Sequence, residues 1–367
     1  MVTISASVGQ NGRNKQPDVL AIQHALNGIP PAKGGPLPPL KEDGIAGPKT
    51  IGAIVKFQRA NSGLIVDGRV DAAGPTLACI NSLAGGKPPK PGPPPKPAPK
   101  FTDQNLYIGG KPAARDIKQD VFGDCYFVAT LAAVAFEDPA MIQSAIYYDA
   151  KSEQFRVRLY ETNGARKYIW VTQAELHDNV RRQGGSYVDN NGKYERIWPC
   201  VIETAYAKMH DKNPADGLGQ GYKAIISGGW PWDGMMAITG NKGNTIKYKQ
   251  YPKLGANGSL EVLGARVAAA LNSHKSVTLW SVPERDPRNF VEKLFGVKIP
   301  QDGLVDNHVY TVLAITRSGT DWNVKVRNPW GTNMGVGEGQ DKASAYMTVS
   351  LRKLVTTGGL ESFQTSK

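Results

Sequence analysis

The strongest hydrophobic pattern in the chain is an uncharged run at residues 126–136, which contains several alanines and is ended by Glu137, Asp138 and Pro139. A helix of this length without a charge must be buried on nearly all sides, because none of its faces suits water. Turn-forming residues precede the run, and Cys125 stands directly before it. The pattern therefore predicts a buried helix with Cys125 at its N-terminus.

Further along the chain, strand and helix periods follow one another. Residues 154–160 and 167–171 alternate with period two around a turn that contains Asn163-Gly164, which is typical of a hairpin. Apolar residues three and four positions apart predict a helix from Trp198 to Met209, with Cys200 inside it but off the apolar stripe. These elements belong to one large unit at residues 101–367.

A second predicted hairpin brings two polar side chains together. Residues 307–315 and 322–328 read as strands around a turn at Ser318-Gly319, and residue 318 is equidistant from His308 and Asn328. A regular antiparallel hairpin centred there places these two side chains opposite each other on one face. Period two leaves Lys325 and Arg327 on the other face.

Cysteine, histidine and asparagine together suit nucleophilic catalysis. The orphan N–H groups and the dipole of a helix N-terminus favour a thiolate at Cys125, and the thiolate is the attacking form. An imidazole takes the proton and returns it to the leaving amine, while an amide orients the ring. Gln119, six residues before Cys125, has an amide that suits an oxyanion hole. For Cys125 alone, a buried structural thiol is the alternative.

Residues 1–85 form a small domain of three predicted helices. These start near Asp18, Pro48 and Pro75, and proline is typical of a first helical turn. The turn at residues 43–48 recurs in weak form at residues 67–75. Cys79 falls in the last helix, where a small thiol fills the core. A proline-rich linker at 86–100 is expected to be extended and semi-rigid.

Composition and charge narrow the function classes. The net charge of +12 suits an anionic polymer such as nucleic acid, a membrane face or a bacterial wall. No zinc-finger spacing, basic helix or basic-aromatic stacking run occurs, so nucleic acid is the least favoured partner. Three cysteines in 367 residues argue against a disulfide framework. Neither a usual signal peptide nor an apolar stretch long enough for a membrane span is seen.

Three separated motifs give the large unit a family resemblance. They are Gln119 through Cys125-Tyr126-Phe127, Gly303-Leu304-Val305 through His308, and Arg327-Asn328-Pro329-Trp330-Gly331. In this order they resemble the calpain-type cysteine proteases, which have a papain-related core. The resemblance implies an α+β fold with two lobes, one holding the nucleophile helix and the other a His/Asn hairpin.

The resemblance also assigns roles to residues. It implies Cys125 as nucleophile, His308 as general base, Asn328 as its orienter and Gln119 in the oxyanion hole. Trp330 shields the His–Asn contact from water. The segment of Gly228 and Gly229 contacts the substrate backbone beside the nucleophile. We expect Trp230, next to it, to contact substrate as well and to wall a side-chain pocket with Trp232; a hydrophobic cap is the alternative for this tryptophan-rich turn. Tyr126 and Asn307 replace the tryptophan and glycine usual at their positions, and Asn307 is expected to touch the leaving side of the substrate.

Residues 1–85 resemble the small peptidoglycan-binding domain of wall hydrolases. The resemblance rests on the helix segments at 18–23 and 53–58 and on the two turn segments. We therefore expect a wall-targeted endopeptidase that acts on protein through a thioester acyl-enzyme. A peptidoglycan peptide hydrolase and a non-catalytic wall-binding protein are the alternatives.

The two resemblances together suggest a use and a location. A protease joined to a wall-binding module without a leader is expected to be a secreted antibacterial effector, exported by a signal-peptide-independent route or delivered to the periplasm of another bacterium. Such a toxin requires an immunity or inhibitor protein in its producer. Calcium, which activates typical calpains, is a possible cofactor, but no EF-hand spacing occurs and no metal ligands are assigned.

Overall fold

A computed structural model describes residues 2–10, 12–83, 100–119, 122–182, 195–214, 217–286, 301–333 and 341–367, with residue 181 described by its backbone only. The chain divides into two compact units, Met1–Ala98 and Pro99–Lys367. Of the linker predicted at 86–100, all but Lys100 lies outside the described residues.

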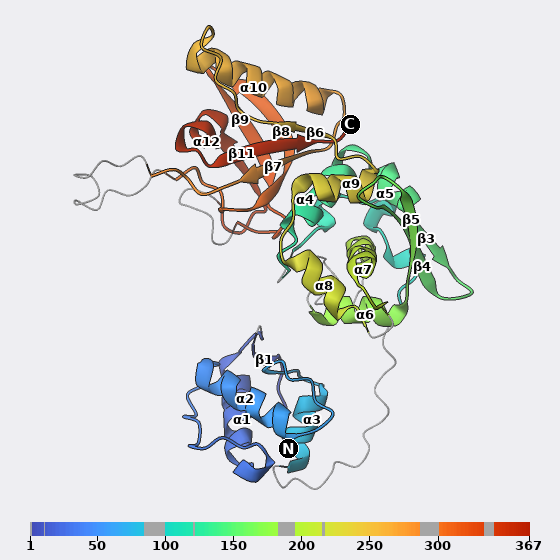
Figure 1. Cartoon of the computed structure of the whole chain (residues 1–367), viewed down its shortest axis with the longest axis vertical. Helices are drawn as coiled ribbons and strands as arrows, with labels where there is room; N and C mark the ends of the chain where they lie inside the picture. The colour runs from blue at the N-terminus through green and yellow to red at the C-terminus, as the bar shows by residue number, and fades with distance from the viewer. Residues whose placement is uncertain are drawn as a thin grey trace, which may run out of the picture. The chain divides into compact units, whose positions relative to one another are not determined.

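The three predicted helices of the N-terminal unit are confirmed as α1 (Gln16–Asn27), α2 (Pro48–Ala60) and α3 (Pro75–Leu83) (Figure 1). A two-residue antiparallel ladder between β1 (Val8–Gly9) and β2 (Arg69–Val70) was not expected. Apolar side chains of all three helices form a core, including Ile22, Leu26, Ile54, Phe57 and Ile80, and Cys79 packs against it. The unit therefore has a hydrophobic core of its own.

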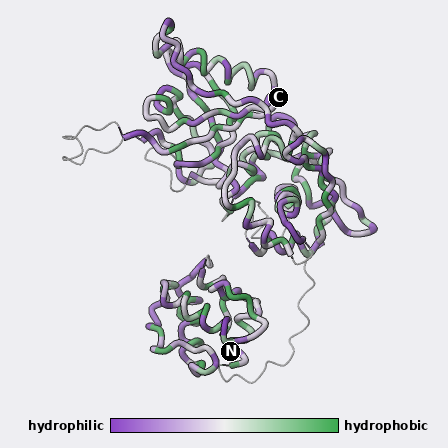
Figure 2. The backbone as a smooth tube through the Cα atoms, in the orientation of Figure 1, coloured by the Kyte–Doolittle hydropathy of each residue, from purple (hydrophilic) through white to green (hydrophobic). Residues whose placement is uncertain are grey.

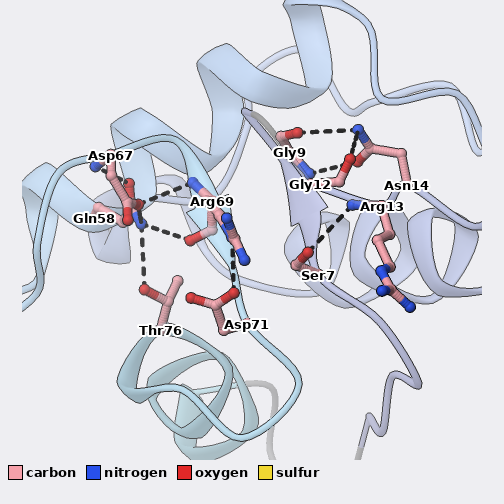
Figure 3. Close-up of polar contacts among 10 residues, drawn as sticks. All are labelled: Ser7, Gly9, Gly12, Arg13, Asn14, Gln58, Asp67, Arg69, Asp71 and Thr76. Carbon is pink, nitrogen blue, oxygen red and sulfur yellow. Dashed lines mark hydrogen bonds and ion pairs between the residues drawn. The ribbon is translucent and has the colours of Figure 1, made fainter. Parts of the chain in front are cut away.

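The internal repeat seen in the sequence is also a structural repeat. Each Asp-Gly turn is linked through a helix glutamine to a threonine in the first turn of the next helix. The networks are Gln23–Asp43–Thr50 and Gln58–Asp67–Thr76, and Figure 3 shows the second. In both, the glutamine Nε2 donates to the aspartate Oδ1, at 2.9 and 2.7 Å, and to the threonine Oγ1, at 3.0 and 3.2 Å. The glutamine Oε1 accepts from the glycine N–H of the turn. Both glutamines are buried, so these networks fix the turns from inside.

The first half of the large unit is a helical lobe. Three short 3₁₀ helices (Asp103–Asn105, Ile108–Gly110 and Ala114–Asp116) lead to α4 (Cys125–Glu137) and α5 (Pro139–Ala145). The other helices are α6 (Gln173–Arg182), α7 (Trp198–His210), α8 (Gly219–Ile226) and α9 (Pro231–Thr239). A three-stranded antiparallel sheet, β3 (Ile146–Asp149), β4 (Gln154–Tyr160) and β5 (Arg166–Val171), lies beside them (Figure 1).

The second half is a sheet lobe. Its six antiparallel strands have the order β10-β9-β8-β7-β11-β6. The strands are β6 (Asn244–Ile246), β7 (Val277–Ser281), β8 (Val309–Ser318), β9 (Asp321–Arg327), β10 (Tyr346–Ser350) and β11 (Leu360–Thr365). In the described part of this lobe they are accompanied by α10 (Gly255–Asn272) and α12 (Leu351–Thr357). The predicted α+β fold with a helical and a sheet lobe is confirmed.

Helix α4 lies where the two lobes meet. All residues from Tyr126 to Ala135 are buried, as the uncharged run predicts, and only Phe136 near its end is exposed. The Thr311 hydroxyl of β8 donates to the Ala129 carbonyl of α4 at 2.8 Å. Each lobe has a buried apolar cluster, and hydrophobic positions recur through both lobes in Figure 2. Cys125 is thereby placed at the junction of the lobes.

Candidate active site

Cys125 is the first residue of α4, directly after the N-cap Asp124. Burial raises the pKa of the Cys125 thiol to about 11, against backbone N–H contacts from Val309 and Tyr126 that lower it. The Asp124 carboxyl, whose own pKa is raised by burial, also disfavours a thiolate. The backbone N–H groups at the helix N-terminus therefore lower the pKa of Cys125 by less than burial raises it, and the resting side chain is a neutral thiol.

His308 and Asn328 lie just beyond the paired part of the β8–β9 hairpin. Its paired residues run from Ser318↔Asp321 to Thr311↔Arg327, with a register shift near residue 313. The hairpin is thus centred between residues 319 and 320, and the register predicted around residue 318 is wrong. The two side chains still meet, because Asn328 directly follows Arg327 at the end of the β8–β9 ladder and His308 directly precedes β8, where its carbonyl accepts from the Ser281 N–H.

A hydrogen bond joins the two side chains. The Nε2 atom of His308 lies 3.0 Å from Oδ1 of Asn328, and the Trp330 backbone N–H donates to the same Oδ1 at 3.1 Å. Because an amide oxygen only accepts, the neutral His308 ring must carry its proton on Nε2. Nδ1 is then the basic nitrogen.

Aromatic rings surround this imidazole. The Trp330 ring centroid lies 4.8 Å from that of His308, and Tyr310 meets the ring edge-on at 4.9 Å. Burial lowers the pKa of His308 to about 4, although the hydrogen bond to Asn328 raises it. No hydrogen bond between Sγ of Cys125 and the His308 ring is found among the described residues. Thiol and imidazole are both neutral near pH 7.

Gln119 is buried next to the nucleophile. Its backbone N–H donates to the Pro329 carbonyl at 2.7 Å, which places it beside the asparagine motif. Its side-chain Nε2 donates to the Phe122 carbonyl at 2.6 Å and to Asp124 Oδ1 at 3.2 Å. The buried Oε1 has no hydrogen-bond partner in the part of the chain that the structure describes. Both amide N–H groups are thus directed into the loop before Cys125.

The glycine segment lies beside the nucleophile. A Cβ on Gly229 would come within 2.6 Å of the Tyr126 ring, so the backbone there packs directly on the residue after Cys125. Gly228 has φ +90° and open space around its Cβ position, and Trp230 is 47% exposed. Tyr126 is buried, and its hydroxyl lies 3.5 Å from the Tyr206 hydroxyl. The segment thus offers an open surface beside Tyr126, the residue after Cys125.

Residues 96–357 match the family model of calpain family cysteine proteases. The chain belongs to the calpain family. A thiol protease of Porphyromonas gingivalis is 28% identical over 236 residues, which cover 61% of this chain and 45% of that protein. Calpain-13 of Rattus norvegicus is 25% identical over 241 residues (63% and 31%), and human calpain-14 is 22% identical over 269 residues (70% and 34%). The chain spans less than half the length of these curated relatives.

The N-terminal unit matches a second family. Residues 15–73 match a family model of a peptidoglycan binding domain, which covers α1, α2 and β2. Both copies of the glutamine and aspartate pair in the repeat fall inside this match. The expected resemblance of this region is confirmed.

Backbone conformation accounts for one departure from the calpain pattern. Asn307 has φ +52°, in the left-handed region where glycine is favoured and asparagine is among the better tolerated side chains. The exposed Asn307 therefore holds a backbone conformation that glycine adopts most readily. Its predicted contact with the leaving side of a substrate stays a prediction.

Arg327 is a site residue that the sequence pattern did not reveal. It was expected on the face opposite Asn328, together with Lys325, but Lys325 is exposed whereas Arg327 is only 2% exposed. The Nη2 of Arg327 donates to the Ile117 carbonyl, two residues before Gln119. A guanidinium from β9 thus holds the loop that leads to Cys125. The sequence feature that pointed to Arg327 is its position directly before Asn328.

The described residues give little sign of a metal site or a membrane helix. No group of three or more His, Cys, Asp or Glu residues that is able to hold a metal ion occurs among them. Within the same ranges, no single helix is long and apolar enough to cross a membrane; α4 and α5 meet the criterion only together, across a 114° bend.

Proposed function

We propose that the calpain unit hydrolyses peptide bonds in proteins through a thioester between the substrate and Cys125. The hydrogen bond from His308 Nε2 to Asn328 Oδ1 carries this proposal, because it leaves Nδ1 as the base. Neutral thiol and neutral imidazole require that the proton move as the sulfur attacks, rather than from a preformed ion pair.

The steps follow from these positions. Nδ1 of His308 takes the thiol proton while Sγ of Cys125 forms a bond to the substrate carbonyl carbon. The C–N bond then breaks, and the proton passes from Nδ1 to the leaving amine. Water attacks the thioester with His308 as base, which releases the acid and restores the thiol.

The oxyanion of the intermediate needs donors. The Cys125 backbone N–H is one, and Gln119 supplies the second once its amide has turned by about half a rotation. Such a turn directs Nε2 to where the unpartnered Oε1 now lies, and it gives up the bonds that Nε2 makes to the Phe122 carbonyl and to Asp124.

Purified protein tested on fluorescent casein decides between the candidate activities. We expect release of peptides that is abolished in Cys125→Ala and retained in Cys200→Ala, because Cys200 is buried and bonds to Asn179. Cleavage of purified sacculi without cleavage of casein would replace this proposal with wall-peptide hydrolysis. Inactivity on both substrates, with the fold intact, would point to a non-catalytic protein.

We further propose that the N-terminal unit directs the protease to peptidoglycan. The family match at residues 15–73 and the separate core support this role. Residues 1–85 should sediment with sacculi, and less so as salt rises if the basic charge contributes. A fragment from Phe101 should cleave casein as well as the full chain; a folded but inactive fragment would show that the units are coupled.

Wall binding joined to proteolysis also suggests an antibacterial effector. We propose delivery to the periplasm of a competing bacterium, and an immunity protein that covers the active site in the producer. Periplasm-directed expression in a test bacterium should arrest growth with Cys125 and spare it with Cys125→Ala. Harmless expression of the folded, active enzyme in both periplasm and cytoplasm would contradict this use.

A further inference from the structure

Three tryptophans from the two lobes form one aromatic cluster. Trp230 precedes α9, Trp232 lies within it, and Trp280 lies on β7. The rings of Trp230 and Trp232 are stacked, with centroids 5.1 Å apart and planes at 11°. Trp280 meets Trp230 edge-on at 4.9 Å and Trp232 at 6.3 Å. We call these three rings the tryptophan cluster.

The tryptophan cluster is tied to the reacting atoms from both sides. Trp280 on β7 pairs with Val309 on β8. Val309 directly follows His308, and its backbone N–H contacts the sulfur of Cys125. Trp230 directly follows Gly229, which packs on the ring of Tyr126. The cluster therefore lies within a few residues' reach of a carbonyl held at Cys125, since an extended chain advances about 3.3 Å per residue.

This cluster is not simply interior packing. Trp230 is 47% exposed, whereas Trp198, a core residue of the same lobe, is fully buried. The stretch 226–230 is exposed throughout, and a Cβ on Gly228 would meet nothing within 4 Å. A stacked ring with open space beside its backbone leaves apolar surface uncovered next to the candidate active site.

We propose that the tryptophan cluster binds an aromatic side chain of the substrate, within two or three residues of the scissile bond. Indole faces and edges favour another ring over an aliphatic chain of similar size, because offset-stacked and edge-to-face pairs add attraction to area burial. The proposal rests on the proteolytic function proposed above and names its substrate class: polypeptides cleaved beside phenylalanine, tyrosine or tryptophan.

The test measures binding apart from cleavage. Alanine–serine decapeptides with one Phe, Leu or Ala are titrated into Cys125→Ala, and the ¹H–¹⁵N indole signals are followed by NMR. We expect the Phe peptide to shift the signals of Trp230 and Trp232 and to bind about 2- to 12-fold more tightly than the Leu peptide. Equal affinities, or shifts confined to other tryptophans, would overturn the proposal.

Variants separate recognition from folding. In the Cys125→Ala background, Trp230→Ala should abolish the Phe preference and Trp230→Phe should retain it. Trp170→Ala, at a 40% exposed tryptophan on β5, should leave it unchanged. With Cys125 restored, the kcat/KM ratio of Phe to Leu peptides should follow the same pattern. A binding preference for the Phe peptide without turnover would contradict the proteolytic function and support the aromatic-binding site. Turnover without that preference would support the proteolytic function and contradict the aromatic-binding site.

Discussion

Asn328 holds His308 through its amide oxygen, with Oδ1 3.0 Å from the imidazole Nε2. The same oxygen is fixed by the Trp330 backbone N–H, so the acceptor cannot rotate away without losing a second bond. An asparagine thus sets which ring nitrogen is basic without adding a charge beside it.

Removing the two side chains should cost activity unequally. His308→Ala removes the proton carrier, and kcat/KM on casein peptides should fall by about 10³-fold or more, whereas Asn328→Ala should lose about 10- to 100-fold. Asn323→Ala, at a half-buried position on β9 five residues before Asn328, should change little and serves as the control. Equal and mild losses at 308 and 328 would mean that both residues are structural.

The pH dependence follows from the two neutral groups. His308 must be unprotonated to act as a base, and its pKa of about 4 places the acid limb of kcat/KM near pH 4. The Cys125 thiol, with a pKa of about 11, should be alkylated by iodoacetamide at a rate that rises about tenfold per pH unit from pH 7 to 9. A plateau in alkylation from pH 5 upward would reveal a preformed ion pair instead.

Asn328→Asp and Asn328→Ala are matched variants for the acid limb. Asn328→Asp puts a carboxylate beside the ring, which favours the imidazolium and should move the acid limb to higher pH. Asn328→Ala removes the bond that raises the His308 pKa and should not move it upward. An unchanged limb in Asn328→Asp would exclude His308 as its origin.

Replacing Arg327 should reduce stability and activity more than replacing Lys325, which carries the same charge. Arg327→Met leaves the Ile117 carbonyl without its buried charged donor and should lower the free energy of unfolding by about 3 kcal/mol. It should also lower kcat, because the loop before Cys125 loosens. Lys325→Met, at an exposed position two residues earlier, should leave both unchanged. Denaturant unfolding and peptide kinetics check the pair, and equal effects would contradict the assigned role.

The glutamine networks should carry stability in the N-terminal unit. Gln58→Ala leaves Asp67, Thr76 and the Gly68 N–H without a shared partner and should destabilise the unit by about 2–3 kcal/mol. Gln23→Ala should behave alike, because its network is the same. Gln10→Ala, at an exposed glutamine, is the control. Thermal unfolding of fragment 1–85 measures all three, and similar midpoints would contradict the prediction.

The local hydrophobic pattern was sufficient to predict several helices and part of the candidate active site. The uncharged run at 126–136 has no face that suits water, so a buried helix with Cys125 at its start was determined by sequence. Proline at the first helical position and the Asp-Gly turns likewise located α2 and α3. The motifs predicted which residues would be neighbours, and His308 and Asn328 do meet.

Tertiary structure decided what depends on contacts between distant segments. The turn lies at residues 319 and 320, and the ladder shifts near residue 313, where the part of β8 paired with β7 ends, so counting from residue 318 placed the register wrongly. Burial of Cys125 and His308 between the lobes reversed the charge states expected from a helix dipole, because desolvation exceeds the dipole's contribution. The direction of the Gln119 amide, the burial of Arg327 and the tryptophan cluster all arise where the lobes meet, and no single stretch of sequence contains that junction.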